Sequence, residues 1–110
     1  MTIQDLEQIE KELNLTLPSE FKSIVGNLSF RDPIHDEAQS ILSITKCFRK
    51  GELGDENWPH DLVAFGHDGC GNYFCFYVSD FEAGIFIRDH ETLEIIKEFN
   101  SFEEFLEEWS

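Results

Sequence analysis

Six consecutive apolar or aromatic residues, the run Tyr73–Val78, leave few folds open to this chain. The run is too short and too aromatic for a helix, and it is typical of a β-strand. Side chains alternate between the two faces of a strand, so Cys75 and both tyrosines share one face, whereas Phe74, Phe76 and Val78 share the other. Because both faces are apolar, we predict a central strand that is covered on each side.

Two amphipathic helices are predicted at the N-terminus. Apolar residues recur there at spacings of three to four, which places them on one helical face. The first set is Ile3, Leu6, Ile9 and Leu13, and the second is Phe21, Ile24, Val25 and Leu28. Thr2 and Asp5 have the spacing of a capping pair at the start of the first helix.

Further strands are predicted where short apolar or β-branched runs are bounded by polar or glycine-rich segments. They are Ser40–Thr45, Leu62–Phe65, Gly84–Arg88 and Leu93–Phe99. The polar stretch Phe30–Gln39 is expected to be a loop. Lys50–Asn57 is expected to be irregular, with room for a short helical turn.

The last predicted element is an amphipathic helix. Ser101 and Glu104 have the Ser-x-x-Glu pattern of a capping box. The apolar face of this helix consists of Phe102, Phe105, Leu106 and Trp109, at positions i, i+3, i+4 and i+7. The element order predicts a single α+β domain over residues 1–110. It has two N-terminal helices, an antiparallel or mixed sheet of about four to five strands, and a C-terminal helix packed on the sheet.

Charge excludes several classes of partner. The chain has 23 acidic residues against 8 basic ones, a net charge of −15. So few basic residues cannot neutralise the phosphates of a nucleic acid, and the same repulsion argues against anionic membranes. A basic protein surface is the partner that this charge favours. Residues 75–110 hold ten acids and two bases, so much of the acidity lies in the last third of the chain.

The cellular location is predicted from two further features. The N-terminus has no basic segment followed by an apolar one, and no run approaches the roughly 20 apolar residues that span a bilayer. Cys47, Cys70 and Cys75 are an odd number of cysteines, which suits a reducing compartment. We therefore expect a cytoplasmic location. For the oligomeric state we expect a monomer or a weak homodimer.

Catalytic, cofactor and metal sites are not predicted. His67, Cys70 and Cys75 are close in sequence, but a zinc site needs closely spaced pairs of ligands that this chain lacks. Gly69 and Gly71 are better explained as positive-φ residues of a hairpin turn, and Cys75 as a small apolar core residue. No nucleophile motif accompanies the cysteines and histidines, so a Cys–His hydrolase is not expected. The glycine-rich turn also lacks the lysine and the following helix of a phosphate site.

Four segments together resemble the SUKH superfamily, which is named for the Smi/Knr cell-wall regulators of fungi. Leu17–Phe21 is similar to the family's Leu-Pro-x-x-aromatic opening, and Leu62–Phe76 to its strand, glycine-rich turn and aromatic strand. Ile85–Glu91 and Ser101–Leu106 are similar to the family's final strand and its Ser-Phe-x-x-Phe-Leu helix. Asn72 stands where the family usually has aspartate.

This resemblance implies a bacterial immunity protein, a non-enzymatic binder that neutralises a cognate secreted toxin, commonly a nuclease. In that case an acidic surface would imitate the phosphates of the toxin's substrate and cover its basic cleft. The fungal members provide the alternative, a regulatory scaffold that binds host proteins or peptides.

Candidate partner-binding residues are one tryptophan and a set of acidic side chains. Charge complementarity raises the association rate, whereas a few aromatic anchors supply most of the affinity. Trp58 lies in an irregular polar segment and is a candidate anchor, with a core-capping role as the alternative. The acidic candidates are Asp61, Asp68, Asp89, Glu91, Glu94, Glu98, Glu103, Glu104, Glu107 and Glu108. A solvated face that keeps the protein soluble is the alternative explanation of these charges.

Overall fold

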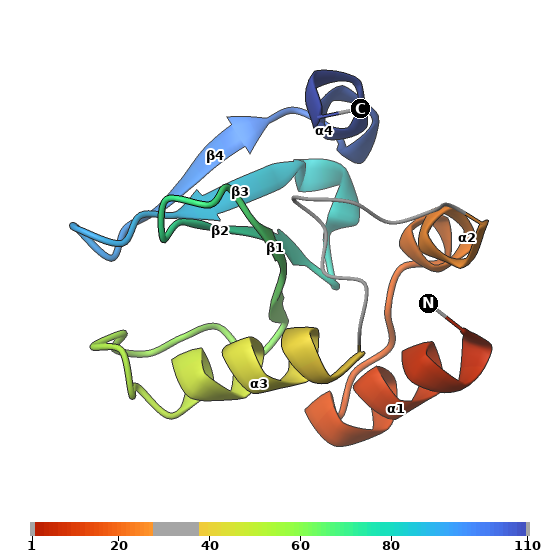
Figure 1. Cartoon of the computed structure of the whole chain (residues 1–110), viewed down its shortest axis with the longest axis horizontal. Helices are drawn as coiled ribbons and strands as arrows, with labels where there is room; N and C mark the ends of the chain where they lie inside the picture. The colour runs from red at the N-terminus through yellow and green to blue at the C-terminus, as the bar shows by residue number, and fades with distance from the viewer. Residues whose placement is uncertain (1, 28–37, 110) are drawn as a thin grey trace.

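The chain folds into an antiparallel sheet with helices around it (Figure 1). The computed structural model describes residues 2–27 and 38–109. Before the sheet lie α1 (Ile3–Leu13), α2 (Ser19–Asn27) and α3 (Ala38–Arg49). The strands are β1 (Leu62–His67), β2 (Tyr73–Tyr77), β3 (Ile85–Arg88) and β4 (Ile95–Phe99). The 3₁₀ turn η1 (Phe81–Ala83) precedes β3, and α4 (Phe102–Trp109) follows β4.

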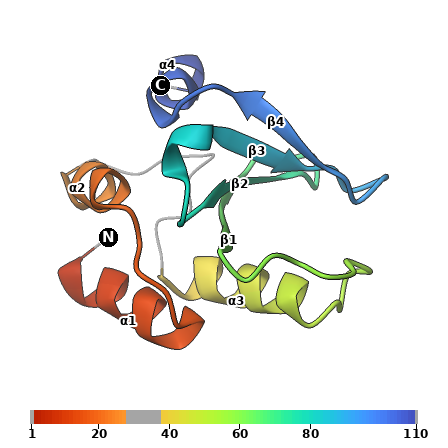
Figure 2. The same ribbon diagram turned by 180° about the vertical axis from the view of Figure 1, so that it is seen from behind.

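These elements confirm the predicted α+β class. The described part of the chain has four strands in the order β1-β2-β3-β4, all paired antiparallel. The aromatic run forms β2, which lies between β1 and β3 as predicted. Phe74 and Phe76 pack into the main core and Cys75 into a second cluster, so both faces of this strand are covered. In both views α4 lies beside β4, whereas α3 lies beside β1 (Figures 1 and 2).

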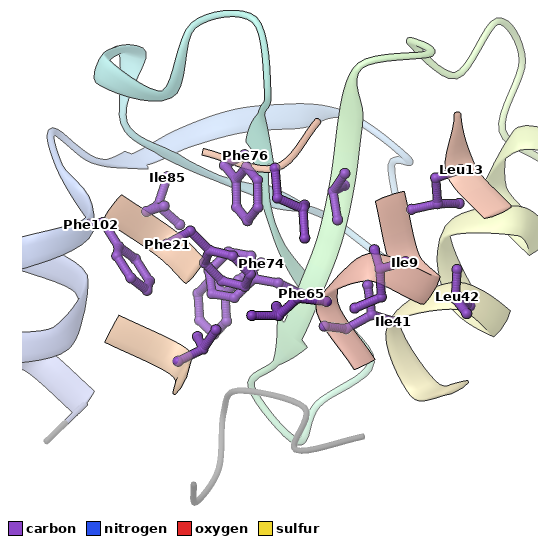
Figure 3. Packing of buried hydrophobic residues seen from close by; sticks show 14 of the residues in the cluster. Ile9, Leu13, Phe21, Ile41, Leu42, Phe65, Phe74, Phe76, Ile85 and Phe102 are labelled. Carbon is purple, nitrogen blue, oxygen red and sulfur yellow. The ribbon is translucent and has the colours of Figure 1, made fainter. Parts of the chain in front are cut away.

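Phenylalanine rings and aliphatic side chains together form the main core (Figure 3). Phe21 of α2 packs against Phe65 of β1 and Phe76 of β2, with ring centroids 5.8 and 4.8 Å apart. Phe102 of α4 lies 5.6 Å from Phe21 and so connects the last helix to the second one. The smaller cluster on the other face of the sheet consists of Phe48, Trp58, Leu62, Ala64 and Cys75.

The predicted helix starts are confirmed. Thr2 Oγ1 accepts a hydrogen bond from the Asp5 N–H, and the Asp5 carboxylate accepts one from the Thr2 N–H. At α4, Ser101 Oγ accepts from the Glu104 N–H at 3.1 Å. The Glu104 carboxylate accepts from the Asn100 N–H at 2.6 Å, one residue before the position expected for a capping box.

The predicted apolar faces are largely buried. Leu6, Ile9 and Leu13 are core residues, but Ile3, the first residue of α1, is 74% exposed. The side chains of three predicted core positions lie outside the described part of the chain: Ile24, Leu28 and Trp109. The same holds for residues 30–37 of the predicted loop Phe30–Gln39, whereas its last two residues belong to α3.

The prediction of a strand at Ser40–Thr45 is wrong, because this segment belongs to helix α3. Its β-branched residues favour a strand locally, but packing overrides that preference. Ile41, Leu42, Thr45 and Phe48 are all buried, and their spacing is that of one helical face. That spacing is complete only when Phe48, beyond the predicted strand, is included. Three helices rather than two therefore precede the sheet in the described residues, and Lys50–Asn57 follows as a series of turns.

Helix α3 is attached to β1 by a buried hydroxyl group. Thr45 is fully buried, and its Oγ1 accepts a hydrogen bond from the Ala64 N–H at 3.1 Å. The same hydroxyl lies 3.5 Å from the Ala64 carbonyl oxygen. The register of β1 shifts between Ala64 and Gly66, where a strand commonly leaves backbone groups without a ladder partner. Helix α3 thus supplies polar contacts to an outer strand of the sheet and covers it.

A buried ion pair connects the α3–β1 loop to β3. Arg88 Nε and Nη2 donate to the Asp55 carboxylate at 3.0 and 2.5 Å, and both side chains are only 4% exposed. The guanidinium also lies 4.6 Å from the centre of the Phe48 ring and donates to the Leu53 carbonyl. The Arg88 guanidinium therefore fixes the loop to the sheet, because it contacts Asp55, Leu53 and the Phe48 ring at the same time.

Gly84 allows β3 to approach β4 closely. Its φ is +106°, and a Cβ at this position would lie 2.2 Å from the carbonyl oxygen of Phe99. No other residue fits there without movement of the β4 backbone.

Candidate functional site

A hollow of about 210 Å³ opens beside α4 on the sheet. Three carboxylates and three apolar side chains line it: Asp68, Glu98, Glu108, Phe74, Ile87 and Phe99. The acids come from three separate segments, namely the β1–β2 turn, β4 and α4. All three are predicted partner-binding residues, so the fold brings together residues that are distant in the sequence.

The apolar lining is part of the core. The rings of Phe74 and Phe99 lie 6.3 Å apart, and each packs against Phe105 of α4 at 5.0 and 5.6 Å. Ile87 is paired in register with Ile96 of β4, whose side chain is 45% exposed. Paired residues of neighbouring strands lie on the same face. The apolar surface therefore continues from the hollow onto the outer strand.

An irregularity in β4 determines where Glu98 points. Phe86 pairs with Lys97, but Ile85 pairs with Phe99, so Glu98 is the extra residue of a β-bulge. In a regular strand Glu98 and Phe99 would face opposite sides of the sheet. A bulge redirects a side chain, and here both residues line the same hollow.

Asp68 stabilises the β1–β2 turn as well as lining the hollow. Its carboxylate accepts hydrogen bonds from the Cys70 N–H at 2.8 Å and from the Asn72 side-chain amide at 2.9 Å. Partial burial opposes ionisation, but these hydrogen bonds outweigh it and hold the pKa of Asp68 below its ordinary value. Asn72 Oδ1 accepts from the His90 N–H at 2.9 Å, which connects this turn to the β3–β4 turn. An aspartate at position 72 would have no amide to donate to Asp68.

Three other predicted acids are also engaged in local structure. Asp61 accepts a hydrogen bond from the Ser79 hydroxyl. Asp89 accepts from the N–H groups of Thr92 and Glu91 in its own turn, and these bonds lower its pKa. Glu104 caps the start of α4, as described above. These carboxylates are therefore fixed in position by backbone or hydroxyl donors.

The remaining predicted acids are exposed, and we call them the acidic face: Glu91, Glu94, Glu98, Glu103, Glu107 and Glu108. Glu91 lies 3.6 Å from the His90 ring. Within residues 2–27 and 38–109, no ion pair includes Glu94, Glu98, Glu103 or Glu108. The nearest cation in sequence, Lys97, forms no ion pair in these ranges, and Arg88 is paired with Asp55. The charge of these four carboxylates is therefore not compensated by an ion pair within the described part of the chain.

Trp58 is placed in the core and not on the surface. It is 8% exposed, stacks on Phe48 with ring centroids 4.5 Å apart, and donates from its indole N–H to the Leu62 carbonyl at 3.0 Å. This is the core-capping alternative raised from the sequence. Because its ring is stacked and its indole N–H is bonded inside the fold, Trp58 offers little surface to a partner.

Comparison with known protein families shows which family this chain belongs to. The model of the SMI1 / KNR4 family (SUKH-1) matches residues 1–108. The chain belongs to that family. A search of curated proteins found no match for this SUKH-1 chain. The described residues contain no helix with the length and apolar character needed to cross a membrane. In the same ranges, no three His, Cys, Asp or Glu side chains lie close enough together to hold a metal ion.

The candidate residues predicted from the sequence include the three acids that line the hollow of the SUKH-1 chain but not the apolar residues between them. Phe74, Ile87 and Phe99 have the pattern of ordinary strand residues, and nothing local shows that they line a hollow. Ile96 carries a detectable signal, because Ile95 and Ile96 are adjacent and cannot both face the same side of a regular strand. One of the two had to lie on the more open face, and it is Ile96 that is exposed.

Proposed function

We propose that this SUKH-1 chain is an immunity protein that binds and neutralises a cognate toxin protein in the cell that produces it. Membership of the family supports the class of function, because the resemblance implies immunity or regulatory proteins that act by binding. The observation that carries the choice of surface is the acidic face, in which Glu98 of β4 and Glu103 and Glu108 of α4 belong to no ion pair among the described residues.

The charge pattern supports a basic toxin, such as a nuclease with a phosphate-binding cleft. Clustered charge of one sign speeds association with a surface of the opposite sign, and like charges disfavour wrong partners. The net charge of −15 adds to this effect at long range. In this mechanism the acidic face occupies the cleft that would otherwise receive the substrate's phosphates, and the toxin is blocked without any chemical step.

The test is binding and protection with the toxin domain encoded by the neighbouring gene. We expect the two proteins to co-purify, and we expect the chain to restore growth of cells that express the toxin. Absence of binding in about 50 mM salt, where surface attraction is strongest, would contradict the proposal.

Charge variants test the surface. Glu94→Gln with Glu103→Gln should slow association severalfold and flatten its dependence on salt, because two steering charges are lost. Glu7→Gln with Glu20→Gln removes the same charge from exposed positions on α1 and α2 and serves as the matched control. Equal effects of the two pairs on the association rate would show that only net charge matters and that the acidic face is not the binding surface.

A further inference from the structure

We propose that the hollow beside α4 receives one arginine side chain of the partner protein. The inference rests on the proposed function, because it specifies the chemistry of the partner at the acidic face. The occupant is defined by three features of the site: its size, its apolar lining and the charge of its rim.

The size of the hollow favours a side chain over a small-molecule ligand. Pockets that enclose cofactors or drug-sized ligands have volumes of roughly 300–1,000 Å³. The hollow measures about 210 Å³. That space suits a single long side chain that enters from a protein surface.

The lining matches a side chain that is apolar along its length and positive at its end. Ile87 and Phe99 are half-buried and offer an apolar surface, with the buried Phe74 behind them. Long basic side chains bury their methylene groups against such surfaces while the charge stays near polar groups. Glu98 and Glu108 supply negative charge, and no ion pair among the described residues uses either of them. Asp68 adds a carboxylate that its turn holds in place.

Arginine fits this combination better than lysine does. Its planar guanidinium can bind carboxylate oxygens in pairs and can lie against aromatic rings, and it gives up its hydration more readily than an ammonium group. The same chain already shows this arrangement. Arg88 is bound by the Asp55 carboxylate through two nitrogens and lies 4.6 Å from the centre of the Phe48 ring. The hollow offers a similar set of groups, phenylalanine rings and carboxylates, without a guanidinium of its own among the described residues.

Exposed Ile96 extends the binding surface beside the hollow. It is paired with Ile87, so it lies on the same face of the sheet and next to the lining. A partner segment that inserts an arginine would place a neighbouring residue over this isoleucine. The expected contact is therefore a basic side chain flanked by an apolar one.

The first experiment uses a small probe, N-acetyl-argininamide, followed by amide chemical shifts of the labelled protein. We expect saturable shifts at Ile87, Phe99 and Glu108. The citrulline analogue has nearly the same shape without the charge, and it should produce no saturable shifts. The lysine analogue should bind at least threefold more weakly. Equal binding of citrulline, or of lysine, would overturn the assignment of an arginine site.

The matched variants are Glu98→Gln with Glu108→Gln, and Glu7→Gln with Glu20→Gln as the control, which removes the same charge from exposed positions outside the lining. The first pair should raise the dissociation constant of the probe at least tenfold, and the control should change it less than threefold. Normal amide spectra of the free variants would establish that they fold. Unchanged probe affinity in the folded pair would overturn the inference.

The same variants with the toxin domain separate this inference from the proposed function. If the toxin binds and the pair lowers its affinity at least tenfold, both stand. If the toxin binds the pair as tightly as the unchanged protein, the arginine site is wrong and the proposed function stands. If the toxin does not bind and the probe still occupies the hollow, the proposed function is wrong and the arginine site stands.

Discussion

Removing one partner of the Arg88–Asp55 ion pair is expected to destabilise the fold severely. In Arg88→Met the Asp55 carboxyl group, with 4% of its side chain exposed, stays buried but loses both guanidinium hydrogen bonds. Breaking a buried pair in this way typically costs about 3–5 kcal/mol. Domains of this size have free energies of unfolding of about 5–15 kcal/mol. One substitution therefore removes a large fraction of the stability.

The measurements are urea unfolding and thermal unfolding, each followed by circular dichroism and by tryptophan fluorescence. The fluorescence reports on the same region, because Trp58 stacks on Phe48 and the Phe48 ring lies beside the Arg88 guanidinium. About 1 kcal/mol shifts the melting temperature of such a domain by roughly 4 °C, so we expect a decrease of roughly 12–20 °C for Arg88→Met.

A second variant separates the ion pair from simple packing. Arg88→Met combined with Asp55→Leu replaces both charges by apolar groups, and such exchanges are often neutral or stabilising. We expect the double variant to recover most of the lost stability. Glu12→Gln breaks the Glu12–Lys46 pair, whose side chains are 36% and 39% exposed, and it should cost less than about 1 kcal/mol. A loss below about 1 kcal/mol for Arg88→Met would refute the reasoning, because it would place this pair with exposed ones.

Three further outcomes are expected. Gly84→Ala should lower the free energy of unfolding in urea by at least about 2 kcal/mol, because the new Cβ would meet backbone atoms. Gly69→Ala has open space around it and should lower the free energy by about 1 kcal/mol, and equal losses for the two variants would contradict this steric explanation. Thr45→Val leaves buried backbone groups of β1 without their partner, so it should cost about 1–3 kcal/mol, with Thr45→Ser retaining most of that stability. Burial raises the pKa of the Cys75 thiol and shields it from reagents. A thiol reagent should therefore modify the exposed Cys70 in the folded protein and Cys75 only after unfolding, and modification of Cys75 in the folded protein would contradict its burial.

Periodicity predicted the elements whose burial pattern is complete within a short segment. The aromatic run of β2 and the face of α4 through Phe105 are of this kind, and so are the two capping patterns. Each depends on residues no more than four positions apart. Such patterns are readable because the same few residues create the local structure and its contact with the core.

The error at α3 has a different cause. Ile41, Ile44 and Thr45 prefer strands when considered alone, and the helical face becomes clear only with Phe48. What selects the helix is contact with distant parts of the chain. Thr45 binds Ala64, 19 residues away, and Arg49 donates to the Leu13 carbonyl, 36 residues away. No local window contains that information.

The candidate site, like the fold, could be predicted from the sequence only in part. Glu98 and Glu108 were candidates from the sequence, because acidic residues are concentrated in residues 75–110. The shape of the site was not predicted, because the hollow depends on a β-bulge at Glu98 and on Phe105 holding α4 against the sheet. The bulge converts a charge that a regular strand would direct away from Phe99 into a neighbour of that ring. A single change of register thus decides whether Glu98 is one more solvated charge or part of a recognition site, and the register is a property of the whole sheet.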